Sequence, residues 1–238
     1  MSKSINRSSR LFEVDGIKIY AGFQKDAPSY IKPWITQFCS LPSNEWFANI
    51  DEVWAGDWFN QYGIKDYFDR FDDAVQLMTN SKSKDWNFFN EEEIHKINGQ
   101  ACKIYGMLHA RWICQPRGME QMKSKYDNGV FGQCPRTSCN GCKVLPVGTT
   151  FSLKRHSVKL FCPKCNDIYR SPPQPVIDGA YFGPAFPHMF LYEYTEYNLS
   201  HQFKPFIQKA FGFRIRIPQG SRPLPHNRND YEEQMLSK

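Results

Sequence analysis

The chain has 238 residues and a formal net charge of +6, and 41% of its residues are hydrophobic and 16% aromatic. This composition predicts a globular protein of one or two domains and argues against a mainly disordered chain. The sequence has no run of 18 apolar residues and begins with the polar stretch MSKSINRSSRLF. We therefore expect neither a membrane-spanning helix nor a secretory signal.

The N-terminal region shows no sustained hydrophobic period, so residues 1–30 are expected to form a flexible tail. A helical domain is predicted over residues 31–129, because apolar residues there recur at helical spacing. Trp54, Trp58 and Phe59 are expected to line its core. The predicted helices cover residues 33–39, 51–63, 66–79 and 91–114, followed by a short helix that ends before the turn at 127–129.

The longest predicted helix has clear signals at both ends. Asn90 can cap its first turn, and three glutamates follow at the positive end of the helix dipole. Pro116 is expected to end it. His109, on this helix, is expected to have a polar surface or capping role.

Five of the eight cysteines lie within residues 134–165. Cys134 and Cys139 are spaced C-x4-C, and Cys162 and Cys165 are spaced C-x2-C. Two such chelate loops are typical of a structural Zn²⁺ site with four thiolates. Cys142 also forms a C-x2-C pair with Cys139, and spacing alone slightly favours that pair, so the first ligand pair stays open.

A zinc-ribbon domain is predicted over residues 130–194. Short strands are expected at 144–147 and 157–161, followed by an irregular aromatic segment and a strand at 189–194. His188 is expected to be a buried, satisfied histidine. Thiols and metal in place of disulfides indicate a reducing compartment, and we expect the protein in the cytoplasm and nucleus.

The last ordered region is predicted to be an extended docking segment, residues 195–217, and residues 218–238 are expected to be disordered. Phe211, Phe213 and Ile215 alternate with Gly212 and two arginines. Two interpretations remain equal. The strand completes the protein's own sheet, or its aromatic rings anchor a partner.

The charge is unevenly distributed, since residues 134–238 carry 14 basic and 7 acidic residues. This favours, as the alternative function, a basic zinc-ribbon protein that binds nucleic acid. A solvated basic face is the preferred interpretation, so nucleic acid is an unlikely partner. No phosphate-binding loop, nucleophile elbow or kinase motif occurs, and a zinc with four thiolates has no open position, so no enzymatic activity is expected. Five of these basic residues could contact phosphates: Lys154, Arg155, Lys159, Arg214 and Arg216.

Several strings resemble the regulatory beta subunits of casein kinase II, and the similarity covers about residues 33–217 in the order of that family. They include WITQFCSLPSNEWF (34–47), YGMLHARWI (105–113), KYDNGVFGQCPR (125–136), LFCPKCNDIY (160–169), DGAYFGPAFPHM (178–189) and FGFRI (211–215).

The resemblance implies an α+β fold: a mainly helical N-terminal domain, a small antiparallel β zinc ribbon and an extended C-terminal docking segment. It implies a non-catalytic regulator of a Ser/Thr kinase that acts on protein substrates. It places one structural Zn²⁺ per chain on Cys134, Cys139, Cys162 and Cys165. It places a homodimer interface on Pro135, Thr137, Ser138 and Ile168. It places docking of the catalytic alpha subunit, within an assembly of two alpha and two beta subunits, on Phe211, Gly212, Phe213 and Ile215.

The sequence also departs from that family at three places. Residues 80–87 are basic where the family has an acidic loop, so regulation through that loop is not expected to carry over. The N-terminal serines lack following acids, so the family's self-phosphorylation site is missing. Thr137 and Ser138 replace a β-branched residue and an aromatic one, and we expect the smaller apolar area to weaken the dimer.

Overall fold

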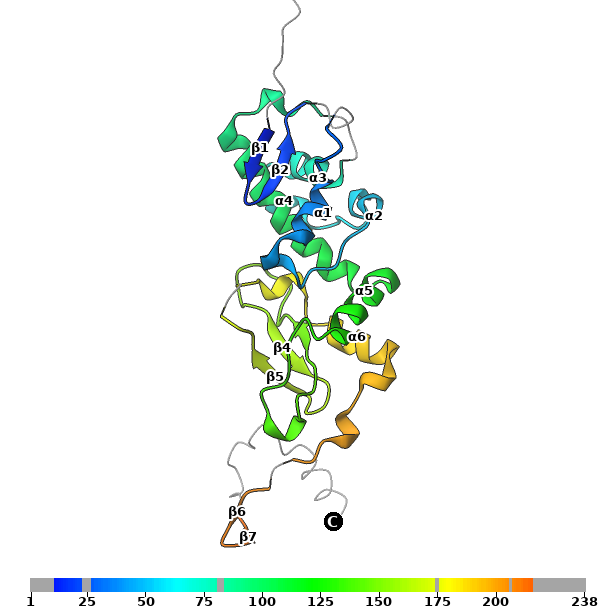
Figure 1. Ribbon diagram of the computed structural model, residues 1–238, viewed down its shortest axis with the longest axis vertical. Helices are drawn as coiled ribbons and strands as arrows, with labels where there is room; N and C mark the ends of the chain where they lie inside the picture. The colour runs from blue at the N-terminus through cyan, green and yellow to red at the C-terminus, as the bar shows by residue number, and fades with distance from the viewer. Residues whose placement is uncertain (1–10, 23–26, 81–83, 174–175, 206, 216–238) are drawn as a thin grey trace, which may run out of the picture.

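The computed structural model describes residues 11–22, 27–80, 84–173, 176–205 and 207–215. It is elongated, with a helical part at one end, a small ribbon next to it, and a hairpin beyond the ribbon (Figure 1). The described residues thus follow the predicted α+β order of helical domain, antiparallel ribbon and extended segment, which confirms the fold class. None of the described helices is long and apolar enough to span a membrane.

The region expected to be a flexible tail contains an antiparallel hairpin, so that prediction was wrong for residues 11–20. Strands β1 (Leu11–Val14) and β2 (Ile17–Tyr20) are joined by Asp15 and Gly16, which have φ angles of 51° and 79°. An Asp-Gly pair with two positive φ angles is typical of a tight type I′ turn. The hairpin buries Val14, Ile17 and Ile19 against α1 and α4.

The helical part consists of five α-helices, and α4 is the longest of those described. Asp51 caps α2 by accepting from the Trp54 amide. Helix α2 ends at Gly56, and the turns that follow leave Trp58 75% and Phe59 71% exposed. The prediction that these two rings line the core was therefore wrong. The helices are α1 (Trp34–Ser40), α2 (Glu52–Gly56), α3 (Phe71–Thr79), α4 (Glu91–Trp112) and α5 (Pro116–Asp127).

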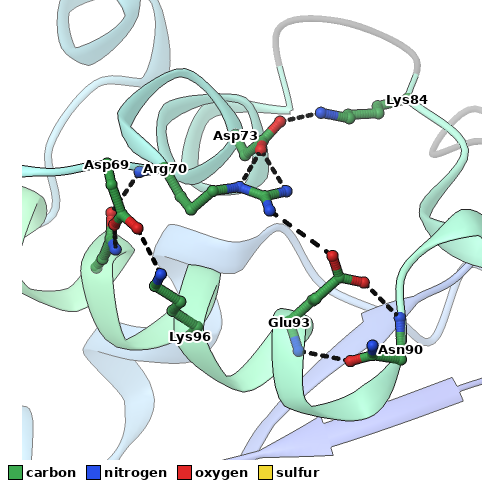
Figure 2. A network of polar contacts seen from close by, with 8 residues as sticks. Asp69, Arg70, Asp73, Lys84, Asn90, Glu93 and Lys96 are labelled. Carbon is green, nitrogen blue, oxygen red and sulfur yellow. Dashed lines mark hydrogen bonds and ion pairs between the residues drawn. The ribbon is translucent and has the colours of Figure 1, made fainter.

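The start of α4 and its neighbour α3 share a polar network (Figure 2). The Asn90 side chain accepts from the Glu93 amide at 2.8 Å, and Glu93 Oε2 accepts from the Asn90 amide at 3.0 Å. These two bonds form a capping box, which confirms the expected Asn90 cap and adds the reciprocal bond from Glu93. Arg70 pairs with Asp73 and Glu93, and Lys84 also pairs with Asp73, so the chain after α3 is fastened to that helix.

The ribbon is a three-stranded antiparallel sheet in the order β3-β4-β5. Its strands are β3 (Leu145–Val147), β4 (Lys159–Cys162) and β5 (Asp167–Arg170), the last of which the sequence pattern did not predict. The prediction of a strand at 189–194 is wrong, since residues 189–193 lie in the helix α6 (Phe186–Glu193) and Tyr194 is its C-cap. Pro187 is favourable in a first helical turn, and Phe186 and Phe190 share a buried face four residues apart.

One continuous core joins the helical part to the ribbon. At the junction, a Cβ on Gly106 of α4 would lie 2.2 Å from the Tyr181 ring, so only glycine allows this approach. Tyr181 ends a short 3-10 helix, Gly179–Tyr181, that leads into α6. The two parts therefore pack directly on each other, with no extended linker between α4 and the ribbon.

Candidate metal centre and docking hairpin

Four cysteine sulfurs gather at one end of the ribbon. The Sγ atoms of Cys134, Cys139, Cys162 and Cys165 all lie within 4.8 Å of one another. Two of the separations, Cys134 to Cys165 and Cys139 to Cys162, are 3.9 Å each. Thiolates at about 2.3 Å from a tetrahedral Zn²⁺ lie roughly 3.8 Å apart. The sulfurs therefore fit one tetrahedral zinc with little rearrangement.

Tight turns in the backbone bring the two cysteine pairs to the same point. Asn140 and Gly141 have φ angles of 51° and 70° and reverse the chain after Cys139, while Asn166, at 51°, turns it after Cys165. Three of the four sulfur-bearing residues are buried and Cys165 is half-buried. Such a closed, mostly dry site with four ligands is typical of structural zinc.

The four-sulfur cluster bears on which two cysteines form the first ligand pair, a choice that the spacing left open. Cys142 is not a member of the four-sulfur group, although its carbonyl accepts from the Cys134 amide at 2.7 Å. The Cys142 backbone thus closes the first loop, while its thiol contacts that of Cys162 without being one of the four. The spacing preference for Cys139 with Cys142 could not anticipate this, because backbone turns decide which sulfurs converge.

The residues expected at the dimer interface lie on the surface of the ribbon. Pro135, Thr137 and Ser138 are exposed in the first metal loop, and Ile168 on β5 is 50% exposed. An ion pair of 2.9 Å between Arg136 and Asp167 draws the two segments together. The four side chains therefore lie on both sides of the Arg136–Asp167 ion pair.

The residues expected to dock a partner form a separate hairpin. Strands β6 (Lys209–Ala210) and β7 (Phe213–Arg214) pair only with each other among the described strands. The interpretation that this segment completes the protein's own sheet is therefore wrong. The exposed fractions are 101% for Phe211, 79% for Phe213 and 47% for Ile215.

The turn of this hairpin places an aromatic residue in an unusual conformation. Phe211 and Gly212 have φ angles of 52° and 87°, again the pattern of a type I′ turn. Such a backbone costs roughly 1–2 kcal/mol for a bulky L-residue, and an exposed ring recovers none of it within the chain. The strain at Phe211 is therefore not offset by packing of its ring.

The expectation that His109 has a polar surface or capping role was wrong, because this residue is fully buried. Its Nε2 accepts from the Ala48 amide at 2.9 Å, so its Nδ1 carries the proton and donates to the Tyr181 carbonyl at 2.7 Å. Burial lowers the pKa of His109 to about 4. The neutral ring therefore joins α4 to both neighbouring segments. Its partners lie 61 and 72 residues away, so the local sequence gave no signal.

Other sequence-based expectations concern surface residues. His188 is exposed on α6, which contradicts the prediction that it is buried. Lys154 and Arg155 are exposed in the segment between β3 and β4, and Arg214 is exposed on the separate hairpin. Arg216 and the predicted tail at 218–238 lie outside the described residues. The basic residues thus come from different parts of the molecule.

The fold and the four-sulfur cluster define a helical protein with a small cysteine-rich ribbon. The family model of the casein kinase II regulatory subunit matches residues 33–214. The chain therefore belongs to the casein kinase II regulatory subunit family.

Curated relatives agree with this assignment. The chain is 39% identical to a putative casein kinase II subunit beta-4 of Arabidopsis thaliana, over 78% of this chain and 66% of the relative. It is 36% identical to casein kinase II subunit beta of Dictyostelium discoideum, over 80% of this chain and 71% of the relative. It is 36% identical to casein kinase II subunit beta of Schizosaccharomyces pombe, over 76% of this chain and 78% of the relative. The chain thus spans about two thirds to four fifths of these relatives.

Proposed function

We propose that this chain is a non-catalytic regulatory subunit that docks the catalytic alpha subunits of a casein kinase II-type Ser/Thr kinase. The observation that carries the proposal is the exposed hairpin with Phe211 and Phe213 at its turn, set beyond a cysteine-rich ribbon (Figure 1). In this role it modulates the stability, activity and substrate choice of the kinase toward proteins. We place it in the cytoplasm and nucleus.

Zinc is the metal proposed for the four-sulfur cluster. Cys134 and Cys139 would hold it from the first loop, and Cys162 and Cys165 from the second. A bound structural zinc supplies folding free energy by joining two loops that share little core of their own. Lys164 donates to the Cys139 carbonyl at 3.4 Å, and Arg136 and Lys164 place positive charge near a group of four thiolates.

The ribbon is also the proposed dimer interface. Pro135, Thr137, Ser138 and Ile168 offer an exposed surface on both sides of the Arg136–Asp167 pair. Two copies that meet through this surface would present two hairpins, one for each catalytic subunit, in an assembly of two alpha and two beta chains. Because Thr137 and Ser138 are small and polar, this contact buries less apolar area than an aromatic pair would.

Docking is proposed to place the rings of Phe211 and Phe213 in apolar pockets of the catalytic subunit, with Ile215 beside them. Buried aromatic anchors dominate interface energies, at about 2–4 kcal/mol each. Gly212 permits the turn through its positive φ angle. The short ladder pairs Ala210 with Phe213 and so holds both rings at one tip of the hairpin.

The test replaces Phe211 with Asn. Asparagine tolerates the left-handed conformation and forms a favoured Asn-Gly turn, so the hairpin is kept while the ring is lost. Binding to a purified catalytic subunit is measured by calorimetry, and we expect affinity to fall by about 30-fold or more. Tyr192→Ala, which removes a ring that is 85% exposed on α6, is the matched control and should bind normally. Unchanged affinity of Phe211→Asn would rule out docking through this ring.

The alternative is a basic ribbon that binds nucleic acid. It predicts binding of labelled DNA or RNA with a steep dependence on salt concentration. The exposed basic residues Lys154, Arg155 and Arg214 come from separate segments, which supports the docking proposal over this one. A mobility shift at low salt with micromolar protein would reverse that preference.

A further inference from the structure

The segment that follows α6 is anchored to the rest of the molecule before it forms the hairpin. Tyr197 donates from its hydroxyl to Asp127 Oδ1 at 2.7 Å, next to the end of α5. Phe203 is then the last hydrophobic side chain of the described residues that packs against the core. All described residues from 207 to 215 are exposed. Phe203 therefore fixes the point from which the hairpin projects.

The group that holds Phe203 comes from the metal loop. The Arg136 guanidinium carbon lies 5.4 Å from the centre of the Phe203 ring and 6.0 Å from that of Tyr169. The same guanidinium donates through Nη2 to Asp167 at 2.9 Å. A planar guanidinium can pair with a carboxylate at its edge while its faces contact aromatic rings. Arg136 makes both kinds of contact, with its side chain only 17% exposed.

We propose that Arg136 is a positioning residue that couples the metal centre to the docking hairpin. The inference rests on the proposed docking function and deepens it. Arg136 lies between Cys134 and Cys139, so the conformation of the metal loop determines where its guanidinium points. That guanidinium holds Phe203, and five residues, 204–208, connect Phe203 to β6.

Loss of this contact lengthens the tether of the hairpin. Without Phe203 as an anchor, the next one is Tyr197, and 11 residues, 198–208, then precede β6. A longer free segment loses more conformational entropy when docking orders it. A chain without the Arg136 contact keeps an intact hairpin and binds the catalytic subunit more weakly.

The experiment compares two variants that break the contact from opposite sides. Arg136→Met with Asp167→Asn removes the ion pair without leaving a buried charge unpaired. Phe203→Leu keeps apolar volume but removes the aromatic face, and leaves the ribbon unchanged. The control is Arg170→Met, since Arg170 is exposed on the same strand as Asp167. The full-length protein is used, and zinc content is measured for each variant.

Two readouts follow. The Gln202 and Phe203 amides donate to the Leu199 and Ser200 carbonyls at 2.9 and 3.2 Å, so their hydrogen exchange reports whether the segment stays anchored. Affinity for the catalytic subunit is measured in parallel. We expect both variants to exchange faster at these amides and to bind about tenfold more weakly, with zinc retained and the control unchanged.

Each outcome decides one of the two claims. Normal exchange and normal affinity in Phe203→Leu overturn the coupling, whatever the first variant does to the metal. If the unmodified protein fails to bind the catalytic subunit while exchange in the variants still rises, the docking function fails and the contact between Arg136 and Phe203 stands. If combining the two changes gives the product of their separate effects, they act independently, which also contradicts the coupling.

Discussion

The helical part and the ribbon bury their residues by different means. In the helical part, rings from distant segments pack together, as with Trp34, Phe38 and Tyr105, whose ring centres lie 4.6 to 5.9 Å apart. The ribbon has three short strands of three or four residues, with four sulfurs gathered at one end. A sheet of this size buries too little apolar area to be stable alone. It shares part of the core of the helical part, and we propose that zinc supplies the remaining stability.

The largest predicted effect tests that dependence. Cys134→Ala removes one of four proposed zinc ligands, and loss of the ion should cost the ribbon on the order of 10 kcal/mol. All six tryptophans lie before residue 113, so their fluorescence reports mainly the helical part, with Trp46 also contacting Phe131 and Phe182 at the junction. We expect zinc content to fall to near zero and ribbon amides to exchange rapidly, while tryptophan emission changes little. A metal-free variant with a protected ribbon would contradict the comparison.

The next effect concerns the buried histidine at the junction. The pKa of His109 is about 4 in the fold against an ordinary value of 6.5. The unfolded chain therefore binds an extra proton between these values, so stability is lost as pH falls from about 6.5 to about 4. The full loss is roughly 3 kcal/mol.

Urea unfolding followed by tryptophan fluorescence measures this loss in the helical part. His109→Gln removes the titrating group, so its stability should change less over the same pH range, although the variant starts lower because a buried bond is altered. Equal pH dependence in both proteins would assign the acid sensitivity to other groups.

A smaller effect separates backbone strain from ring contact in the hairpin. Gly212→Ala meets no atom within 4 Å, so its cost comes only from the positive φ angle, at roughly 1–2 kcal/mol. Docking affinity measured by calorimetry should fall about five- to 30-fold. Gly63→Ala is the matched control, because Gly63 also has a positive φ angle and open space but lies in the helical part. Similar docking losses in both variants would remove the special role of the hairpin turn.

The smallest effect is at the capping box of α4. Asn90→Ala removes the bond to the Glu93 amide and should lower the free energy of unfolding by about 1 kcal/mol. Thermal unfolding should show a decrease of a few degrees in Tm, with zinc content unchanged. A change in zinc content would mean that the two parts are not stabilised separately.

Local signals predicted part of this structure well. The cap at Asn90 and the apolar period fixed α4, since both depend on residues within one or two turns. The hairpin at the N-terminal end also has a local signal, because Asp-Gly between apolar runs strongly favours a tight turn. The prediction of a flexible tail did not use this signal from Asp15 and Gly16.

Other features could not be read from the sequence because they depend on distant partners. His109 finds its donor at residue 48 and its acceptor at residue 181, and Arg136 finds Phe203 across 67 positions. Trp58 and Phe59 have the composition of core residues, but the early end of α2 turns them outward. For the same reason, cysteine spacing indicated a zinc site, while the folded turns brought Cys134 rather than Cys142 to the side of Cys139.

The β6–β7 hairpin has its own hydrogen-bonded ladder and, among the described strands, pairs with none of the ribbon. The hairpin is thus a separate structural unit. Its eight residues, 208–215, can be replaced by another sequence, with other exposed side chains, without repacking the interior. Under the proposed docking function, partner selectivity can then change while the cysteine-rich scaffold stays constant.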